Sequence, residues 1–170
     1  MKGDLNTLRK VCRYASKVML AGEIVFGFLI IGTLVLGVAS LLSPDMMDWM
    51  NAWTQALDNA TDLSLPTYLQ FLVFLVLGQL TVDVIRRLMT IISDEYSPFI
   101  DRSVDLLKKA AWCYLGGAVI LPILEIAGSG AISSVLFLLF GPILIATVLY
   151  CLALVFRYGV ILQTQYDETL

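Results

Sequence analysis

One stretch of the chain decides its fold: residues 18–42 read VMLAGEIVFGFLIIGTLVLGVASLL, and Glu23 is the single charged residue among them. About 20 apolar residues in a helix cross roughly 30 Å of membrane hydrocarbon. This stretch is long enough, and it exceeds the roughly 7–15 apolar residues of a cleaved signal peptide. We therefore expect a membrane-spanning helix that is retained in the protein.

Three further stretches have the same character. The second is apolar or weakly polar up to Asp83, the third contains Pro122, and only Gly128-Ser129-Gly130 separates the third from the fourth, as in a tight helical hairpin. We predict an all-α fold, an integral membrane four-helix bundle in a single domain of residues 1–170. Its expected spans are residues 18–42, 68–92, 110–127 and 131–156.

The composition of the whole chain excludes several classes of protein. Of 170 residues, 59% are hydrophobic and 15% are charged, against about 45–50% and 25% in soluble domains. The chain has no histidine, which removes the commonest general base and metal ligand. The sequence contains no nucleophile, phosphate-binding or metal motif. We expect a protein that is not an enzyme, holds no cofactor and does not bind nucleic acid directly.

The basic residues predict the orientation. The loop of residues 43–67 and the hairpin at Gly128 hold no Lys or Arg, whereas the ends of the spans away from them hold all of these residues. Because cytoplasmic loops are rich in Lys and Arg, we expect a protein of the cytoplasmic (inner) membrane, with both termini, the loop 93–109 and the tail 157–170 in the cytoplasm. The basic residues are Lys2, Arg9, Lys10, Arg13, Lys17, Arg86, Arg87, Arg102, Lys108, Lys109 and Arg157.

Several charges fall within the spans, near their cytoplasmic ends. An ionisable group in a spanning helix is costly and needs a partner, so we expect Glu23 to pair with Arg86 or Arg87, and Asp83 to pair with Arg87 four residues later. The predicted inner polar belt comprises Glu23, Asp83, Arg86, Arg87 and Arg157.

Two interpretations of Glu23 remain open. It is either a structural ion-pair partner or the functional carboxylate of a small dimeric exporter, in which a buried glutamate exchanges a proton for a cationic substrate. Glu125 lies near the other end of the third span, so the two carboxylates do not form a shared site.

The loop of residues 43–67 has a helical period of its own. Apolar residues including Trp49 and Trp53 recur every three or four positions, and an amphipathic helix with two tryptophans is typical of the membrane–water interface. We predict an outer interfacial region of Trp49, Trp53 and Glu125. It is either a simple connector or a lid and partner-binding face.

Three short motifs resemble a known family. They are Ala15-Ser16-Lys17-Val18, then Glu95-Tyr96-Ser97-Pro98-Phe99, and a tail with Phe156-Arg157-Tyr158-Gly159-Val160-Ile161-Leu162-Gln163 and Tyr166-Asp167-Glu168-Thr169-Leu170. The chain resembles the YoaS-like four-span prokaryotic membrane proteins (domain of unknown function 2975), although Tyr96 stands where that family usually has glycine.

The resemblance implies a partner. Members of the family are often encoded beside a small helix-turn-helix regulator, so we expect a sensory or regulatory module that binds a cytoplasmic transcription regulator. The alternatives are the exporter and a structural subunit of a larger membrane complex. The candidate docking residues are Asp94, Glu95, Pro98, Phe99, Gln163, Asp167 and Glu168.

Overall fold

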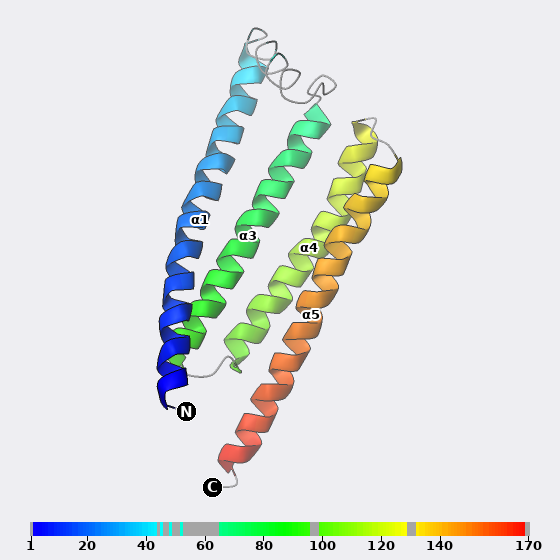
Figure 1. The fold of residues 1–170 in the computed structure, drawn as a ribbon. Coiled ribbons are helices and arrows are strands. Elements are labelled where there is room, and N and C mark those ends of the chain that lie inside the picture. The colour runs from blue at the N-terminus through cyan, green and yellow to red at the C-terminus, as the bar shows by residue number, and fades with distance from the viewer. Residues whose placement is uncertain are drawn as a thin grey trace.

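The computed structural model describes residues 2–43, 45, 48, 52, 65–95, 99–128 and 132–168. Within these residues the protein is helical, with no strand. Figure 1 shows the helices side by side in chain order. They are α1 (Lys2–Leu42), α3 (Leu65–Glu95), α4 (Asp101–Ala127) and α5 (Ile132–Glu168).

Four segments of these helices are long and apolar enough to cross a membrane. They are Lys10–Ala39, Leu65–Ser93, Asp101–Ala127 and Ile132–Tyr166. The predictions of an all-α fold and of a multi-pass membrane protein are confirmed at this level. The helices run beyond the expected spans because polar residues continue them: α4 begins at Asp101 rather than at residue 110, and α5 continues to Glu168.

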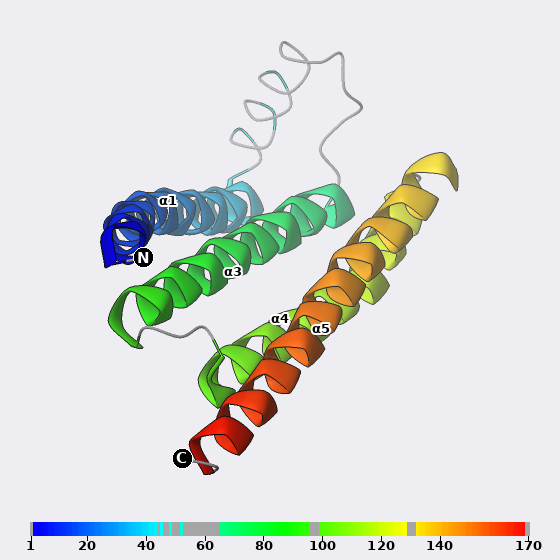
Figure 2. The ribbon, with the colours of Figure 1, turned by 60° about the horizontal axis from the view of Figure 1, so that its bottom comes forward.

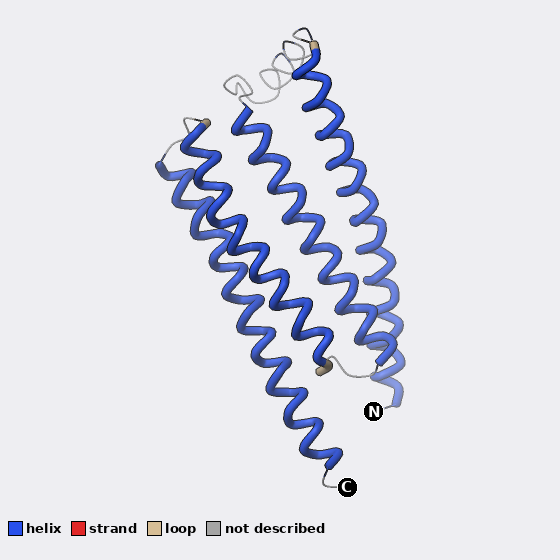
Figure 3. The backbone as a smooth tube through the Cα atoms, turned by 180° about the vertical axis from the view of Figure 1, so that it is seen from behind, coloured by secondary structure: helices blue, strands red, loops and turns tan. Residues whose placement is uncertain are grey.

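The helices alternate in direction, so the first residues of α1 and the last residues of α5 lie at the same end of the molecule (Figure 1). Seen from behind, Figure 3 shows the same order. We call this the basic end, because the Lys and Arg residues of the described helices all fall in the halves of these helices nearer to it. The last residues of α1, the first residues of α3 and the turn at Gly128 lie at the opposite end (Figure 1).

Helices α3, α4 and α5 share a core. One buried cluster joins Leu77 of α3, Tyr114 and Leu121 of α4, and Ala146 of α5. A second cluster lies nearer the basic end and contains Val84, Val104, Leu107, Ala110 and Ala153. The alanines matter because small residues let spanning helices approach closely without a hydrophobic driving force.

Helix α1 is attached differently. Its backbone approaches that of α3 alone among the described helices, and α3 lies between α1 and the α4–α5 pair in Figure 2. Two glycines permit this approach, because the Phe26 ring lies over Gly78 and the Tyr68 ring lies over Gly37. The Tyr68 hydroxyl donates a hydrogen bond to the carbonyl oxygen of Thr33.

Replacing Gly37 by alanine tests this packing. The new Cβ would overlap the Tyr68 ring, so we expect Gly37→Ala to lower the free energy of unfolding by about 1–3 kcal/mol. The matched control is Gly32→Ala on the same helix, where a Cβ meets nothing within 4 Å and alanine favours the helix by about 1 kcal/mol. Unfolding in mixed detergent–SDS micelles measures both, and equal stability of the two variants would contradict the packing.

Candidate functional site: a polar cluster between α1 and α3

The charged residues of the spans meet where α1 and α3 pack together. Four of them form what we call the polar cluster: Glu23 of α1 and Asp83, Arg86 and Arg87 of α3. The side chains of Glu23, Asp83 and Arg86 are about a quarter exposed before any lipid covers them, and that of Arg87 is half exposed.

Arg86 joins the two helices. Its Nε lies 2.6 Å from Oε2 of Glu23, and its Nη2 donates a hydrogen bond of 3.4 Å to Oε1 of the same carboxylate. The guanidinium therefore lies close to both oxygens of Glu23 as an ion pair, with one hydrogen bond, from Nη2, while Nε makes no hydrogen bond of its own to a described residue.

Asp83 completes the cluster on the α3 side. Its Oδ1 accepts a hydrogen bond of 2.8 Å from Nε of Arg87, four residues on, and lies 3.5 Å from Nη2 of Arg86. Two carboxylates and two guanidinium groups cancel in charge. A neutral, hydrogen-bonded group is tolerated in a membrane where one unpaired charge is costly.

Hydroxyl groups continue the α1–α3 contact on both sides of the cluster. Toward the basic end, the hydroxyl oxygens of Ser16 and Thr90 lie 3.0 Å apart, and Thr90 also donates to the carbonyl oxygen of Arg86 at 2.9 Å. Toward the other end lies the Tyr68–Thr33 bond. Polar contacts therefore recur along the whole α1–α3 contact.

This geometry favours the structural interpretation of Glu23. A carboxylate that exchanges a proton for a cationic substrate must bind and release that substrate. The position of such a substrate beside Glu23 is taken by Arg86, which belongs to the protein and lies close to both oxygens of the carboxylate.

No family model, no curated protein and no solved structure matches this chain. The resemblance to YoaS-like proteins therefore stays a prediction. Among the described residues, no group of three or more cysteine, aspartate or glutamate side chains is placed to hold a metal ion.

The structure does not bring Arg157 into the cluster. Arg157 is exposed on α5, whose backbone approaches only α4 among the described helices, and no ion pair joins it to Glu23 or Asp83. Glu125 is half-buried near the far end of α4, so it is also remote from Glu23. Trp49 and Trp53 lie outside the described residues, and the amphipathic helix of the loop stays a prediction.

The expected docking residues occupy the basic end. Phe99 packs edge-on against Phe156, with ring centres 5.7 Å apart and an interplanar angle of 80°. Asp94 and Glu95 end α3, while Gln163, Asp167 and Glu168 lie on the last turns of α5. Pro98 lies outside the described residues.

Two features escaped sequence analysis. The Tyr114 hydroxyl of α4 hydrogen-bonds with Thr81 of α3, a contact that needs the register of two helices to be known. A pocket on the outer side of the α4–α5 pair contains Trp112 and Tyr150; the only signal for it was the presence of both aromatic residues in apolar runs.

A double-mutant cycle tests the ion pair. We expect Glu23→Gln and Arg86→Gln each to destabilise the protein, because each leaves a charge unpaired, and the double variant to lose at least about 1 kcal/mol less than the sum. The control pairs Glu23→Gln with Arg87→Gln, whose main partner is Asp83, and its coupling energy should be clearly smaller than that of Glu23 with Arg86, because the two side chains share the cluster without a direct ion pair.

Two outcomes would count against the structural interpretation. One is additivity for Glu23 with Arg86 in the same unfolding assay. The other is a Glu23→Gln variant of unchanged stability that abolishes export of cationic substrates from cells, which would favour the exporter.

Proposed function

We propose that this protein is a regulatory interaction module of the inner membrane, with both termini in the cytoplasm. It binds a cytoplasmic partner at the basic end, on a surface formed by the loop before α4 and the final turns of α5. The observation that carries the proposal is the packing of Phe99 on α5. The phenylalanine ring contacts Phe156 and covers Gly159, one turn further along.

This packing makes one unit of two segments that are distant in sequence. A side chain at position 159 would overlap the Phe99 ring, so Phe99 lies close to the α5 backbone because residue 159 is glycine. A loop that only connects two spans needs no such contact, because short connections are satisfied by their own turn geometry.

The length of α5 adds support. Its 37 residues extend about 55 Å at helical rise, whereas about 20 residues suffice to cross the membrane. With the span ending near residue 156, as the sequence predicts, the surplus lies at the basic end and carries exposed Gln163 and Glu168. These turns are helical, so they offer a partner a helical surface rather than an extended tail.

The polar cluster supplies a means of changing this surface. Helix α1 is held to α3 by polar contacts, and α3 leads through Asp94 and Glu95 into the loop that Phe99 attaches to α5. A signal that separates Glu23 from Arg86 would alter the position of α3 relative to α5, and hence the docking surface. The signal can shift the protein from the paired to the separated arrangement of Glu23 and Arg86 only by as much free energy as the difference in its affinity for the two arrangements.

The resemblance to YoaS-like proteins is what narrows the partner to a helix-turn-helix transcription regulator. Exposed Glu168 on the last turn of α5 is suited to a basic side chain of such a partner. Direct binding of nucleic acid is not proposed.

Site-specific photo-cross-linking in intact cells tests the proposal. A photoreactive residue at Gln163 or Glu168 should form an adduct with a cytoplasmic protein, whereas one at Ile132, exposed at the other end of α5, should not. Phe99→Ala should reduce the adduct several-fold by releasing the loop. Phe137→Ala, on an exposed face of α5, is the matched control and should leave it unchanged.

The proposal fails if Gln163 and Glu168 yield no cytoplasmic adduct. It also fails if adducts at Gln163 are the same as those at Ile132, since that result would place the last turns of α5 among nonspecific neighbours or on the other side of the membrane.

A further inference from the structure

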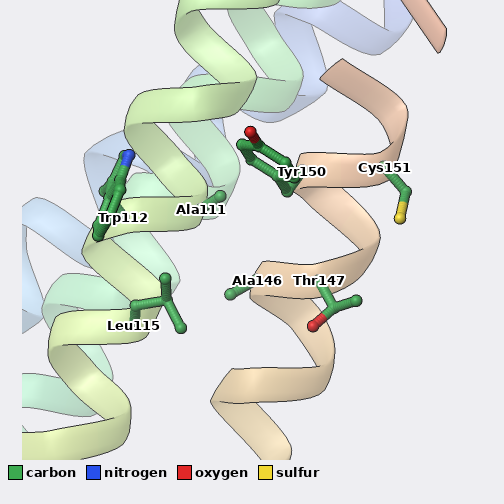
Figure 4. A pocket seen from close by; sticks show the side chains of 7 residues that line it. All are labelled: Ala111, Trp112, Leu115, Ala146, Thr147, Tyr150 and Cys151. Atoms are coloured by element: carbon green, nitrogen blue, oxygen red, sulfur yellow. The ribbon is translucent and has the colours of Figure 1, made fainter. Parts of the chain in front are cut away.

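A hollow of about 310 Å³ lies between α4 and α5 on their outer side (Figure 4). Trp112 and Tyr150 lie at one end of it, and Leu115, Ala146 and Thr147 at the other. Since α4 and α5 run in opposite directions, the aromatic pair marks the end nearer the basic end of the protein. The remaining lining residues are Ala111 and Cys151.

The hollow is apolar apart from a few side-chain tips. The Thr147 hydroxyl is satisfied by the carbonyl oxygen of Ile143 at 2.8 Å. The Trp112 indole and the Tyr150 hydroxyl make no hydrogen bond within the part of the chain that the structure describes, and Trp112 is 70% exposed. Such side chains prefer a level where one end meets hydrocarbon and the other meets polar groups.

Two cations follow the hollow toward the basic end. Lys108 precedes Trp112 by four residues and so lies on the same face of α4, about 6 Å nearer the basic end along the helix axis. Arg157 follows Tyr150 by seven residues and so lies two turns along the same face of α5, about 10 Å nearer the basic end along the helix axis. Neither cation forms an ion pair with a described residue, and Arg157 is exposed.

The first charges beyond the hollow toward the basic end are positive, namely Lys108 and Lys109 on α4 and Arg157 on α5. Asp105 and Asp101 share the face of Lys108 but lie about one and two turns further along α4. An apolar hollow that leads to unpaired cations at one membrane surface matches an amphiphile with an anionic head and an apolar chain.

We propose that the hollow binds one anionic phospholipid. An acyl chain lies along Leu115 and Ala146, the ester region contacts the tips of Trp112 and Tyr150, and Lys108 and Arg157 bind the headgroup phosphate. This site is independent of the regulatory role proposed above.

A second copy of the chain is a poorer occupant. Copies inserted with the same orientation place their own Lys108 and Arg157 at the same depth, so two such faces would bring like charges together. An anionic lipid instead neutralises them, with about 1 kcal/mol, or roughly a fivefold gain in affinity, for each cation near the surface.

Quenching of Trp112 fluorescence tests the site. The chain has three tryptophans, so the variant Trp49→Phe/Trp53→Phe leaves Trp112 alone. In vesicles of mixed lipids, phosphatidylglycerol with brominated acyl chains should quench Trp112 at a several-fold lower mole fraction than brominated phosphatidylcholine. Adding Lys108→Gln and Arg157→Gln should remove this preference, while the matched pair Lys10→Gln and Arg13→Gln on α1 should preserve it.

Equal quenching by the two lipids would overturn the proposal, and so would a preference that survives the loss of Lys108 and Arg157. Quenching by neither lipid, with a dimer detected by cross-linking through Cys151, would assign the hollow to a second copy instead. Circular dichroism of each variant verifies that the helices are intact, so a loss of preference is not a loss of fold.

Discussion

Hydrocarbon cannot hydrogen-bond to a charged side chain, and this constraint governs the attachment of α1. Glu23 interrupts an otherwise apolar span, so α1 can enter the membrane at low cost only with a cation at the same depth. Arg86 supplies that cation from α3 with its Nε 2.6 Å from the carboxylate. The ion pair thereby selects the neighbour of α1 and fixes the register of the two helices, from which the Ser16–Thr90 contact and the packing of Tyr68 over Gly37 follow.

The rest of the protein is held by packing. Alanines at positions 110, 146 and 153 are almost fully buried and bring α4 and α5 together with α3. Packing between complementary apolar surfaces is insensitive to local charge, whereas an ion pair responds to protons, ions and voltage. Helix α1 is therefore held to α3 by the ion pair in addition to the packing at Gly37 and Gly78, and the ion pair is the part of this attachment that responds to charge.

Sequence analysis could predict the spans and the need of Glu23 for an arginine, because both follow from the chemistry of hydrocarbon. It could not choose between Arg86 and Arg87, which lie about 100° apart around α3, since that choice depends on which face of α3 meets α1. Arg157 was grouped with Glu23 by depth alone, yet α5 approaches only α4. Depth can be counted along a sequence, whereas the neighbours of a helix are decided by packing.

The central claim is that the Glu23–Arg86 pair holds α1 to α3 and that α4 and α5 do not depend on it. Electron paramagnetic resonance can measure two distances in a variant whose cysteines 12, 113 and 151 are replaced: spin labels at Phe28 and Phe71 report α1–α3, and labels at Val119 and Phe140 report α4–α5, all at exposed positions. In Glu23→Gln, we predict a broader or longer α1–α3 distance distribution and an unchanged α4–α5 distribution. An unchanged α1–α3 distribution, or equal broadening of both, would contradict the claim.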